Sequence, residues 1–333
     1  MTSNGISAAG RAIGKKDSQV TLVEVSPRDG LPEVCNRLST EDKIKYINKL
    51  SDTGLRKIEC ASFTHPRLMP DGYDAEKLIA GIDKKPDVTY VGLVPNEIGC
   101  RRAVITQIDE ILFVLSASDT FNRINIGRSL KESLNKMLPS IMDTAVKNSR
   151  SIRVYVMTAF GCPYTGRINP EEIAQLLLKL DYMGASEVVL LDSTGMANPK
   201  SVKSTLRVLL DLQLNIDLAV HFHNTRGAAI ANCVAAFEAG VRIFDTSLCG
   251  MSATPYGVSE MDIGYWNVPT EDLVHLFEEM GIKTGIDLDR LLDCARLAEK
   301  MAGVPLPGHI LRARPASQIF EIPSHLKQPK AME

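Results

Sequence analysis

The sequence predicts an α/β protein with a (β/α)8 TIM barrel and additional C-terminal helices. Eight short runs rich in β-branched residues alternate with helical patterns over roughly 250 residues, which is the strand count and length of such a barrel. The runs are continuously apolar, as expected of parallel strands that are covered on both faces. A doubly wound sheet that binds a nucleotide would carry a glycine-rich phosphate-binding turn, and the chain contains neither GxGxxG nor GxxxxGK[ST].

Each apolar run is expected to be one strand, because it is short, rich in Val, Ile and Leu, and followed by a helical pattern. In chain order the runs are 21–25, 56–61, 89–94, 110–117, 151–160, 187–194, 217–224 and 242–248.

The helical patterns carry recognisable ends. Residues 39–54 begin with Ser and Thr followed by acids, and residues 169–184 have Pro170 in the first turn and Gly184 at the end; all are usual helix boundaries. Extra helices are expected after residue 269. We therefore divide the chain into a flexible N-terminal arm (1–19), a barrel domain with its C-terminal helices (20–312) and a C-terminal tail (313–333).

Charge and composition argue against several classes of function. The 38 Lys and Arg residues against 40 Asp and Glu give a net charge of −2, which offers no basic field for nucleic acid. No apolar run of ~18 residues predicts a membrane span. Seven cysteines without a CxxC pair are typical of a reducing compartment. We expect a cytoplasmic protein, with organellar import through the N-terminal arm as the alternative.

Polar residues gather at the expected carboxyl ends of strands, where barrel enzymes carry their active sites. The first strand runs into Arg28 and Asp29, the sixth carries Asp192, and the seventh contains His221 and His223. Because residues i and i+2 of a strand face the same way, both imidazoles should enter the barrel mouth. With Asp29 they would form a site for a divalent metal such as Zn, Fe, Co or Mn. The alternative is a hydrogen-bonded pair of structural histidines.

Three further features allow both a catalytic and a structural interpretation. Glu59 lies in an otherwise apolar strand and needs a buried partner, for which Arg28 is the candidate. The glycine-containing segment 250–264 after the last strand is either a mobile lid or an ordinary connector. Cys162 is a candidate nucleophile, but buried structural cysteines are the more common case.

Several longer motifs follow one another in a specific order. They are EVSPRDGL (24–31), IExxSF (58–63), YVMTAFGCPYTGRINP (155–170), LLDSTG (190–195), VHFHNTRGAAIAN (220–232) and NVPTEDLVHLFEEMGIKTGIDLDRL (267–291). In these motifs the chain resembles the 3-hydroxy-3-methylglutaryl-CoA (HMG-CoA) lyase family, part of the metal-dependent barrel lyases related to isopropylmalate synthase. The resemblance extends over about residues 20–312.

The resemblance implies a metal site and a set of catalytic residues. The residues that match the family's ligands to Mg²⁺ or Mn²⁺ are Asp29, His221, His223 and Asn267. Arg28 matches the arginine that stabilises an enolate, and Glu59 matches the acid that supports this arginine. Two further acids match family positions: Asp192 an aspartate implicated in proton transfer, and Glu271 an outer acid near the metal.

The chain departs from the family at a loop that carries a proton-transferring cysteine. The family reads Gly-x-Gly-Gly-Cys-Pro-Tyr there, whereas residues 250–256 read GMSATPY, so Thr254 stands in the place of the cysteine. A threonine hydroxyl is a poor acid or base near pH 7, unlike a thiol of pKa ~8.5. Cys249 is a candidate substitute if the lid folds differently. Asn224 and Arg226 also replace a family Asp and Tyr, and Arg226 adds a cation for a second carboxylate or a CoA phosphate.

The expected reaction is a retro-Claisen cleavage of an acyl-CoA substrate, in the first place of HMG-CoA to acetyl-CoA and acetoacetate. One alternative is a sister lyase for citramalyl-CoA or a longer branched glutaryl-CoA. Others are a catalytically weak paralogue that binds metal and acyl-CoA, and a condensing synthase that runs in the opposite direction. The resemblance also implies a homodimer.

Overall fold

Eight parallel strands close into a barrel in the computed structural model, which describes residues 19–35, 38–65, 74–253 and 266–318. Each strand pairs with its successor in the chain, and β8 pairs with β1 to complete the cylinder. The predicted barrel is therefore confirmed. The strands are β1 (Thr21–Glu24), β2 (Lys57–Ser62), β3 (Thr89–Leu93), β4 (Glu110–Ser116), β5 (Ser151–Met157), β6 (Glu187–Asp192), β7 (Asp217–Phe222) and β8 (Ile243–Thr246).

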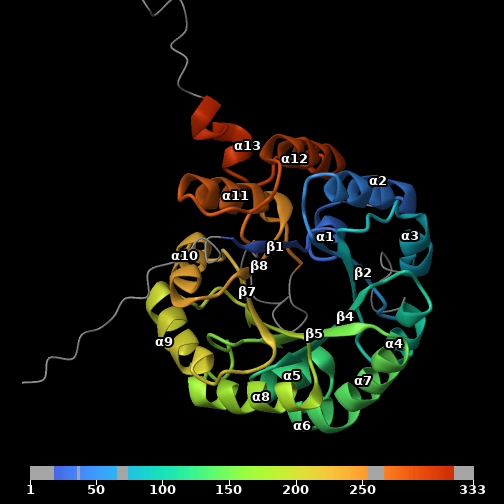
Figure 1. Ribbon diagram of the computed structural model, residues 1–333, viewed down its shortest axis with the longest axis vertical. Helices are drawn as coiled ribbons and strands as arrows, with labels where there is room; N and C mark the ends of the chain where they lie inside the picture. The colour runs from blue at the N-terminus through green and yellow to red at the C-terminus, as the bar shows by residue number, and fades with distance from the viewer. Residues whose placement is uncertain (1–18, 36–37, 66–73, 254–265, 319–333) are drawn as a thin grey trace, which may run out of the picture.

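Helices surround the strands as a ring (Figure 1). They are α1 (Leu31–Val34), α2 (Thr40–Ser51), α3 (Ala75–Gly81), α4 (Glu97–Val104), α5 (Asp119–Ile126), α6 (Leu130–Glu132), the π-helical turn η2 (Ser133–Met137), α7 (Leu138–Lys147), α8 (Pro170–Met183), α9 (Pro199–Leu210), α10 (Ala229–Ala239), the 3₁₀ turn η3 (Leu248–Gly250), α11 (Thr270–Glu279), α12 (Leu288–Ala302), α13 (Ile310–Ala313) and the 3₁₀ turn η5 (Ala316–Gln318). No helix in these described segments is long and apolar enough to cross a membrane.

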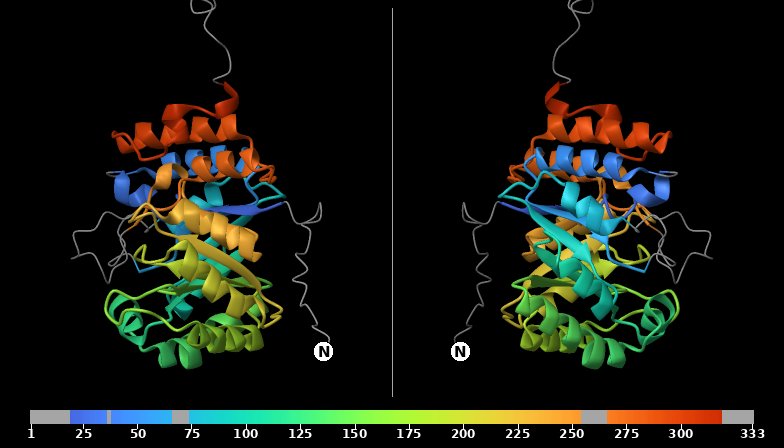
Figure 2. Two further views of the ribbon diagram at one scale, coloured as in Figure 1. Left: turned by 90° about the vertical axis from the view of Figure 1, so that its left-hand side faces the viewer. Right: turned by 90° about the vertical axis from the view of Figure 1, so that its right-hand side faces the viewer.

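The additional C-terminal helices extend the ring on one side. Helix α12 packs against α2 and α11, and both views of Figure 2 show α12 and α13 as an outer layer beyond α2. Helix α2 begins where the Ser39 side chain accepts the Asp42 N–H over 3.0 Å, a usual N-cap. Helix α8 has Pro170 in its first turn and ends at Gly184 with a φ of 88°, a conformation that favours glycine.

Most strands end one to three residues earlier than their apolar runs predict, and β5 and β7 show the physical reason. Strand β5 ends at Met157, because Thr158 has a φ of 57°, a left-handed conformation that is rare for a β-branched residue and breaks the strand. Strand β7 ends at Phe222. His223 pairs instead with Asn267 in an isolated antiparallel bridge. This bridge brings the segment before α11 to the carboxyl end of β7.

The barrel interior is ionic as well as apolar. Lys57, Glu110 and Glu187 are the first residues of β2, β4 and β6, and Lys57 Nζ lies 2.8 Å from Glu110 Oε2 and 3.0 Å from Glu187 Oε2. A second group of buried side chains is separate from the large core shared by strands and helices. It consists of Val91, Leu112, Phe121, Tyr155, Met157, Cys162, Val189, Leu191 and Ala219.

Candidate metal centre and active site

The loop after β1 meets the segment after β8 at the barrel mouth. Gly30 marks their closest approach, since a Cβ atom there would lie 2.5 Å from the carbonyl carbon of Met251 and 2.6 Å from the nitrogen of Ser252. Its φ of 129° also favours glycine. The Ala253 N–H donates to Asp29 Oδ1 over 3.3 Å. Glycine at position 30 therefore allows the loop after β1 to pack against the segment after β8, where Asp29 contacts Ala253.

Asp29, His221 and His223 form a buried cluster of potential metal ligands. One carboxylate oxygen and one nitrogen from each ring all lie within 4.8 Å of one another. Asn267 joins them, because its Nδ2 donates to Asp29 Oδ2 over 2.9 Å and its Oδ1 lies 2.8 Å from His221 Nε2. The structure thus brings together the four residues that the sequence analysis named as metal ligands.

The hydrogen bonds of Asn267 and His221 direct two lone pairs at each other. Asn267 Nδ2 donates to Asp29 Oδ2 and to the Met251 carbonyl, both over 2.9 Å, so Asn267 Oδ1 is the atom that faces His221. His221 Nδ1 faces the Asp245 carboxylate at 3.2 Å, a contact that favours the tautomer with its proton on Nδ1. In that tautomer Nε2 has a lone pair aimed at Asn267 Oδ1. A cation that both atoms bind would satisfy this arrangement.

Burial and charge favour the protonation states that metal ligands need. Burial, first of all, lowers the pKa of His223 to about 3, and the charges of His221 and Arg28 act in the same direction, so this imidazole is neutral near pH 7. Burial alone would raise the pKa of Asp29, but Arg28, the two histidines and the Asn267 hydrogen bond lower it below its usual range. Neutral imidazole and ionised carboxylate are the forms that bind metals.

Arg28 lies beside this cluster and contacts two carboxylates. Its Nη1 is 3.2 Å from Asp29 Oδ1, and its Nε donates to Glu59 Oε1. Glu59 is fully buried, whereas the Arg28 side chain is 12% exposed. The predicted pairing of Glu59 with Arg28 is therefore present. Within the described residues, these contacts engage Nε and Nη1 of Arg28.

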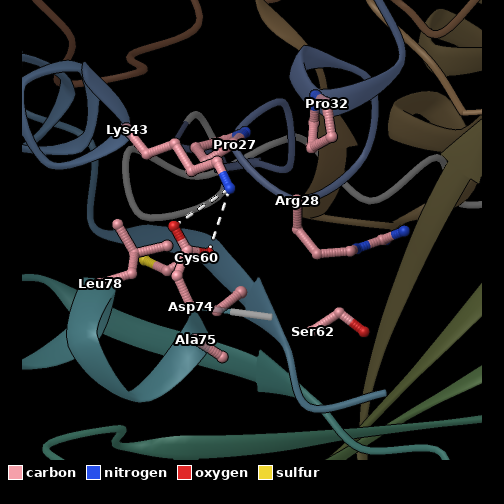
Figure 3. A pocket seen from close by; sticks show the side chains of 10 residues that line it. Pro27, Arg28, Pro32, Lys43, Cys60, Ser62, Asp74, Ala75 and Leu78 are labelled. Carbon is pink, nitrogen blue, oxygen red and sulfur yellow. Dashed lines mark hydrogen bonds and ion pairs between the residues drawn. The ribbon is translucent and has the colours of Figure 1, made fainter. Parts of the chain in front are cut away.

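Arg28 also lines a small pocket on the outer side of β2 (Figure 3). Lys43 of α2 lies across this pocket, and its Nζ is 3.1 Å from Oδ1 of Asp74, the residue that precedes α3. The Thr40 hydroxyl also donates to Asp74 Oδ2, over 2.6 Å. These contacts connect α2 to the start of α3 and so hold in place the side of the pocket that faces Arg28.

Asp192 ends β6 and closes the turn that follows it. Its Oδ1 accepts the Met196 N–H over 2.8 Å, and its Oδ2 accepts the Ala197 N–H over 3.1 Å. Burial raises the pKa of Asp192 to about 6, although the two N–H groups and the charges of Arg226 and His221 oppose the shift. A carboxyl group with a pKa near 6 is suited to proton transfer near neutral pH.

Glu271 and Cys249 contact each other on the side of the barrel that α12 covers. Glu271 Oε2 accepts the Cys249 N–H over 2.9 Å. Cys249 is fully buried, its Sγ lies 3.8 Å from the carbonyl of Ala295 on α12, and burial raises its pKa far above the usual value. The structure contradicts the hypothesis that Cys249 takes over the role of the family's loop cysteine, because its thiol faces α12.

We expect Glu271→Gln to remove a pH dependence from stability. Burial, followed by the charge of Asp272, raises the pKa of Glu271 from 4.5 to about 8. Between these values the unfolded chain releases the proton that the folded chain keeps, so stability falls as the pH rises. The loss is on the order of 4 kcal/mol by pH 8.5. Urea unfolding should show the variant close to wild type at pH 5 and more stable at pH 8.5; parallel pH profiles would contradict this.

Cys162 has the features of a structural cysteine. It is fully buried, and its Sγ donates to Ser118 Oγ over 3.2 Å. Within the described residues it lies among the apolar side chains of the barrel interior. Thr254 and the rest of the candidate lid from residue 254 to 264 lie outside the described residues.

Asn224 and Arg226 organise the loop after β7. Asn224 Oδ1 accepts the Ala229 N–H over 3.2 Å at the start of α10. Arg226 Nη1 donates to the carbonyls of Thr194 and Gly195 over 2.7 and 3.1 Å. The arginine therefore ties the loops after β6 and β7 together.

Sequence reasoning missed three residues that underlie the cluster. Asp245 contacts His221; the Tyr155 hydroxyl lies 2.5 Å from Asp245 Oδ2; and Arg153, fully buried, forms an ion pair with Asp245. Arg153 and Asp245 stand inside apolar strands just as Glu59 does. Buried charges need partners, so the argument that singled out Glu59 would have found them too.

A closed (β/α)8 barrel with an Asp–His–His–Asn cluster and an adjacent arginine at its mouth defines a barrel enzyme with a candidate divalent-cation centre. Comparison with known proteins makes the class specific. The HMGL-like family model matches residues 19–298, and the chain belongs to this family.

Individual relatives agree with this assignment. The chain is 42% identical over 294 residues to hydroxymethylglutaryl-CoA lyase YngG of Bacillus subtilis. This match covers 88% of this chain and 97% of that protein. It is 37% identical over 282 residues to the human mitochondrial hydroxymethylglutaryl-CoA lyase, 85% of each chain. The structure of an HMG-CoA lyase from Acinetobacter baumannii, in complex with coenzyme A and 3-methylmalate, superposes with a TM-score of 0.85. It is 36% identical and covers 92% of this chain and 99% of its own.

Proposed function

We propose that this chain is a divalent-cation-dependent carbon–carbon lyase that cleaves HMG-CoA to acetyl-CoA and acetoacetate. One observation carries the proposal: a buried Asp–His–His–Asn cluster lies directly beside Arg28, in a chain related to HMG-CoA lyases over most of its length. The cluster suits a cation that binds substrate oxygens, and the arginine suits an enolate.

The charges inside the barrel support a divalent cation. The carboxylates of Asp29, Glu59 and Asp245 outnumber the guanidinium groups of Arg28 and Arg153 with which they form ion pairs. A cation bound in the cluster would offset the remaining negative charge.

The donor set fits a divalent cation. Asp29, His221, His223 and Asn267 would hold it with two oxygens and two imidazole nitrogens, and Mg²⁺ or Mn²⁺ is the choice that the family resemblance implies. A cation held there supplies Lewis-acid polarisation of the 3-hydroxyl and a carboxylate oxygen of the substrate.

Arg28 then acts on the other half of the substrate. When the C2–C3 bond breaks, its electron pair passes to C2 and the thioester carbonyl, while the 3-hydroxyl oxygen becomes the new ketone. The Arg28 guanidinium stabilises the resulting enolate charge. Glu59 holds Arg28 in place through its Nε. Protonation of the enolate at C2 completes acetyl-CoA.

Asp192 is our candidate for removal of the 3-hydroxyl proton. It ends the strand next to β7, and its pKa of about 6 leaves it mostly ionised at pH 7 yet able to hold a proton. The proton that reaches C2 comes from a group in the loop of the family's cysteine, where this chain has Thr254.

We expect Thr254→Cys to raise the rate of HMG-CoA cleavage. A thiol of pKa ~8.5 donates a proton far more readily than an alkyl hydroxyl, so kcat should increase by about tenfold or more. Thr254→Ser keeps a hydroxyl and is the matched control. If kcat for the cysteine variant equals that of the control, residue 254 does not protonate the enolate.

Substrate choice is tested by offering HMG-CoA, citramalyl-CoA and a longer branched glutaryl-CoA in parallel, with the products identified by mass spectrometry. We expect acetyl-CoA and acetoacetate from HMG-CoA with the highest kcat/KM. Pyruvate from citramalyl-CoA as the dominant product would mean that Thr254 marks a change of substrate. Mn²⁺ binding without any cleavage would mean a catalytically weak paralogue.

We infer further that the protein is a homodimer, as the family resemblance implies. A cytoplasmic location is consistent with its similarity to a bacterial lyase. Sedimentation equilibrium of the purified chain should give twice the mass of 36.5 kDa. A monomer at micromolar concentration would contradict the dimer.

A further inference from the structure

A buried ionic network runs beneath the proposed cation centre. Arg153 of β5 donates to both carboxylate oxygens of Asp245 on β8, through Nη1 over 3.1 Å and through Nη2. Its Nε contacts Glu187, whose other oxygen lies 3.0 Å from Lys57 Nζ. Arg153, Asp245 and Glu187 are each at most 4% exposed. The guanidinium thus fixes the Asp245 carboxylate in one plane.

Asp245 connects this network with both parts of the site. Its Oδ2 lies 3.2 Å from His221 Nδ1 and 2.5 Å from the Tyr155 hydroxyl. The same hydroxyl lies 2.9 Å from Glu59 Oε2, and Glu59 holds Arg28. Its single proton can be donated to only one carboxylate at a time. One tyrosine therefore links the arginine to the histidine ligand.

The contact with Asp245 determines which nitrogen of His221 is available. A carboxylate beside Nδ1 accepts a hydrogen bond from the ring N–H and so favours the proton on Nδ1. Nε2 then keeps its lone pair, at 2.8 Å from Asn267 Oδ1. In the other tautomer, Nε2 would carry a hydrogen toward the cation and could not bind it. Residues that orient a ligating histidine in this way commonly affect metal affinity 10- to 100-fold.

We propose that Asp245 is a positioning residue of the cation centre, which selects the His221 tautomer and is itself held by Arg153 and Tyr155. The inference rests on the cation site of the proposed function and extends it to residues that touch neither cation nor substrate. A buried ion pair such as Arg153–Asp245 adds little to stability by itself, because both charges must be removed from water. Apolar side chains in their place would avoid this cost, so stability alone does not explain the pair.

The test compares Mn²⁺ affinity in Asp245→Asn with that of wild type, by counting free Mn²⁺ in electron paramagnetic resonance spectra. The asparagine amide can donate to Nδ1 and so favour the wrong tautomer, which should raise the Mn²⁺ dissociation constant about 10- to 100-fold. Glu187→Gln is the matched control, because it also removes one carboxylate from Arg153 but none from His221. It should bind Mn²⁺ within about twofold of wild type.

A structural role predicts a different pattern. If Asp245→Asn melts at a lower temperature in EDTA but binds Mn²⁺ as tightly as wild type, the proposal is overturned. Should this variant fail to fold, Tyr155→Phe decides, since loss of its hydrogen bond to Asp245 should weaken Mn²⁺ binding about three- to tenfold; unchanged affinity would overturn the proposal. Affinity is measured without substrate, so a wild type that binds Mn²⁺ but leaves HMG-CoA intact would refute the proposed reaction and not this inference.

Discussion

Arg28→Gln is expected to reduce turnover of HMG-CoA about 10³-fold while Mn²⁺ binding stays within about threefold of wild type. Arg28 is the cationic side chain that contacts Asp29 and retains some exposure, at 12% of its side chain. The enolate that forms when C2–C3 breaks would lose its counter-charge, whereas the substrate before cleavage carries no such charge. The loss should therefore appear in kcat more than in KM.

The variant needs a control for the carboxylate that it leaves behind. Glu59 is fully buried and pairs with Arg28, and a buried charge without its partner costs about 3–5 kcal/mol. The double variant Arg28→Gln with Glu59→Gln removes that charge and should recover most of the melting temperature without recovering turnover. Loss of Mn²⁺ binding in both variants would mean that Arg28 supports the structure of the site rather than the enolate.

His223→Ala is expected to weaken Mn²⁺ binding at least about 100-fold and to abolish cleavage at micromolar Mn²⁺. The pKa of about 3 keeps this imidazole neutral, and its bridge with Asn267 joins the carboxyl end of β7 to the segment before α11. Removing a direct ligand should cost more than the 10- to 100-fold typical of residues behind the ligands. His275→Ala, on α11 and outside the cluster, is the matched control.

Turnover of His223→Ala should return in part at millimolar Mn²⁺, since the other three ligands remain. A variant that binds Mn²⁺ normally and still fails to turn over would show that His223 contacts substrate instead of the cation.

The repeat of apolar runs was sufficient to predict the barrel. All eight runs became strands in the predicted order, because burial on both faces leaves a pattern in the local sequence. The residues Asp29, His221 and His223 were found for a similar reason: polar groups at strand ends meet at one end of a barrel. Their approach to within 4.8 Å follows from the fold.

The rest of the site depends on contacts between distant strands. Arg153 and Asp245 are 92 positions apart, and Tyr155 and Glu59 are 96 apart; no local pattern pairs them. Asn267 was known only through the family resemblance, because it reaches His223 through a bridge outside the regular sheet. Cys249 was named only as a conditional substitute for the loop cysteine, and its thiol faces α12 instead, which sequence position alone does not show.

The central claim is that this chain cleaves HMG-CoA with the help of a divalent cation held at the barrel mouth. The most direct measurement is the release of acetyl-CoA and acetoacetate by the wild-type protein, first after chelation with EDTA and then with Mg²⁺ or Mn²⁺ restored. We predict no cleavage by the chelated protein and equimolar release of the two products once the cation is added. Cleavage that persists in EDTA would contradict the role of the cation, and the absence of acetoacetate with either metal would contradict the proposed reaction.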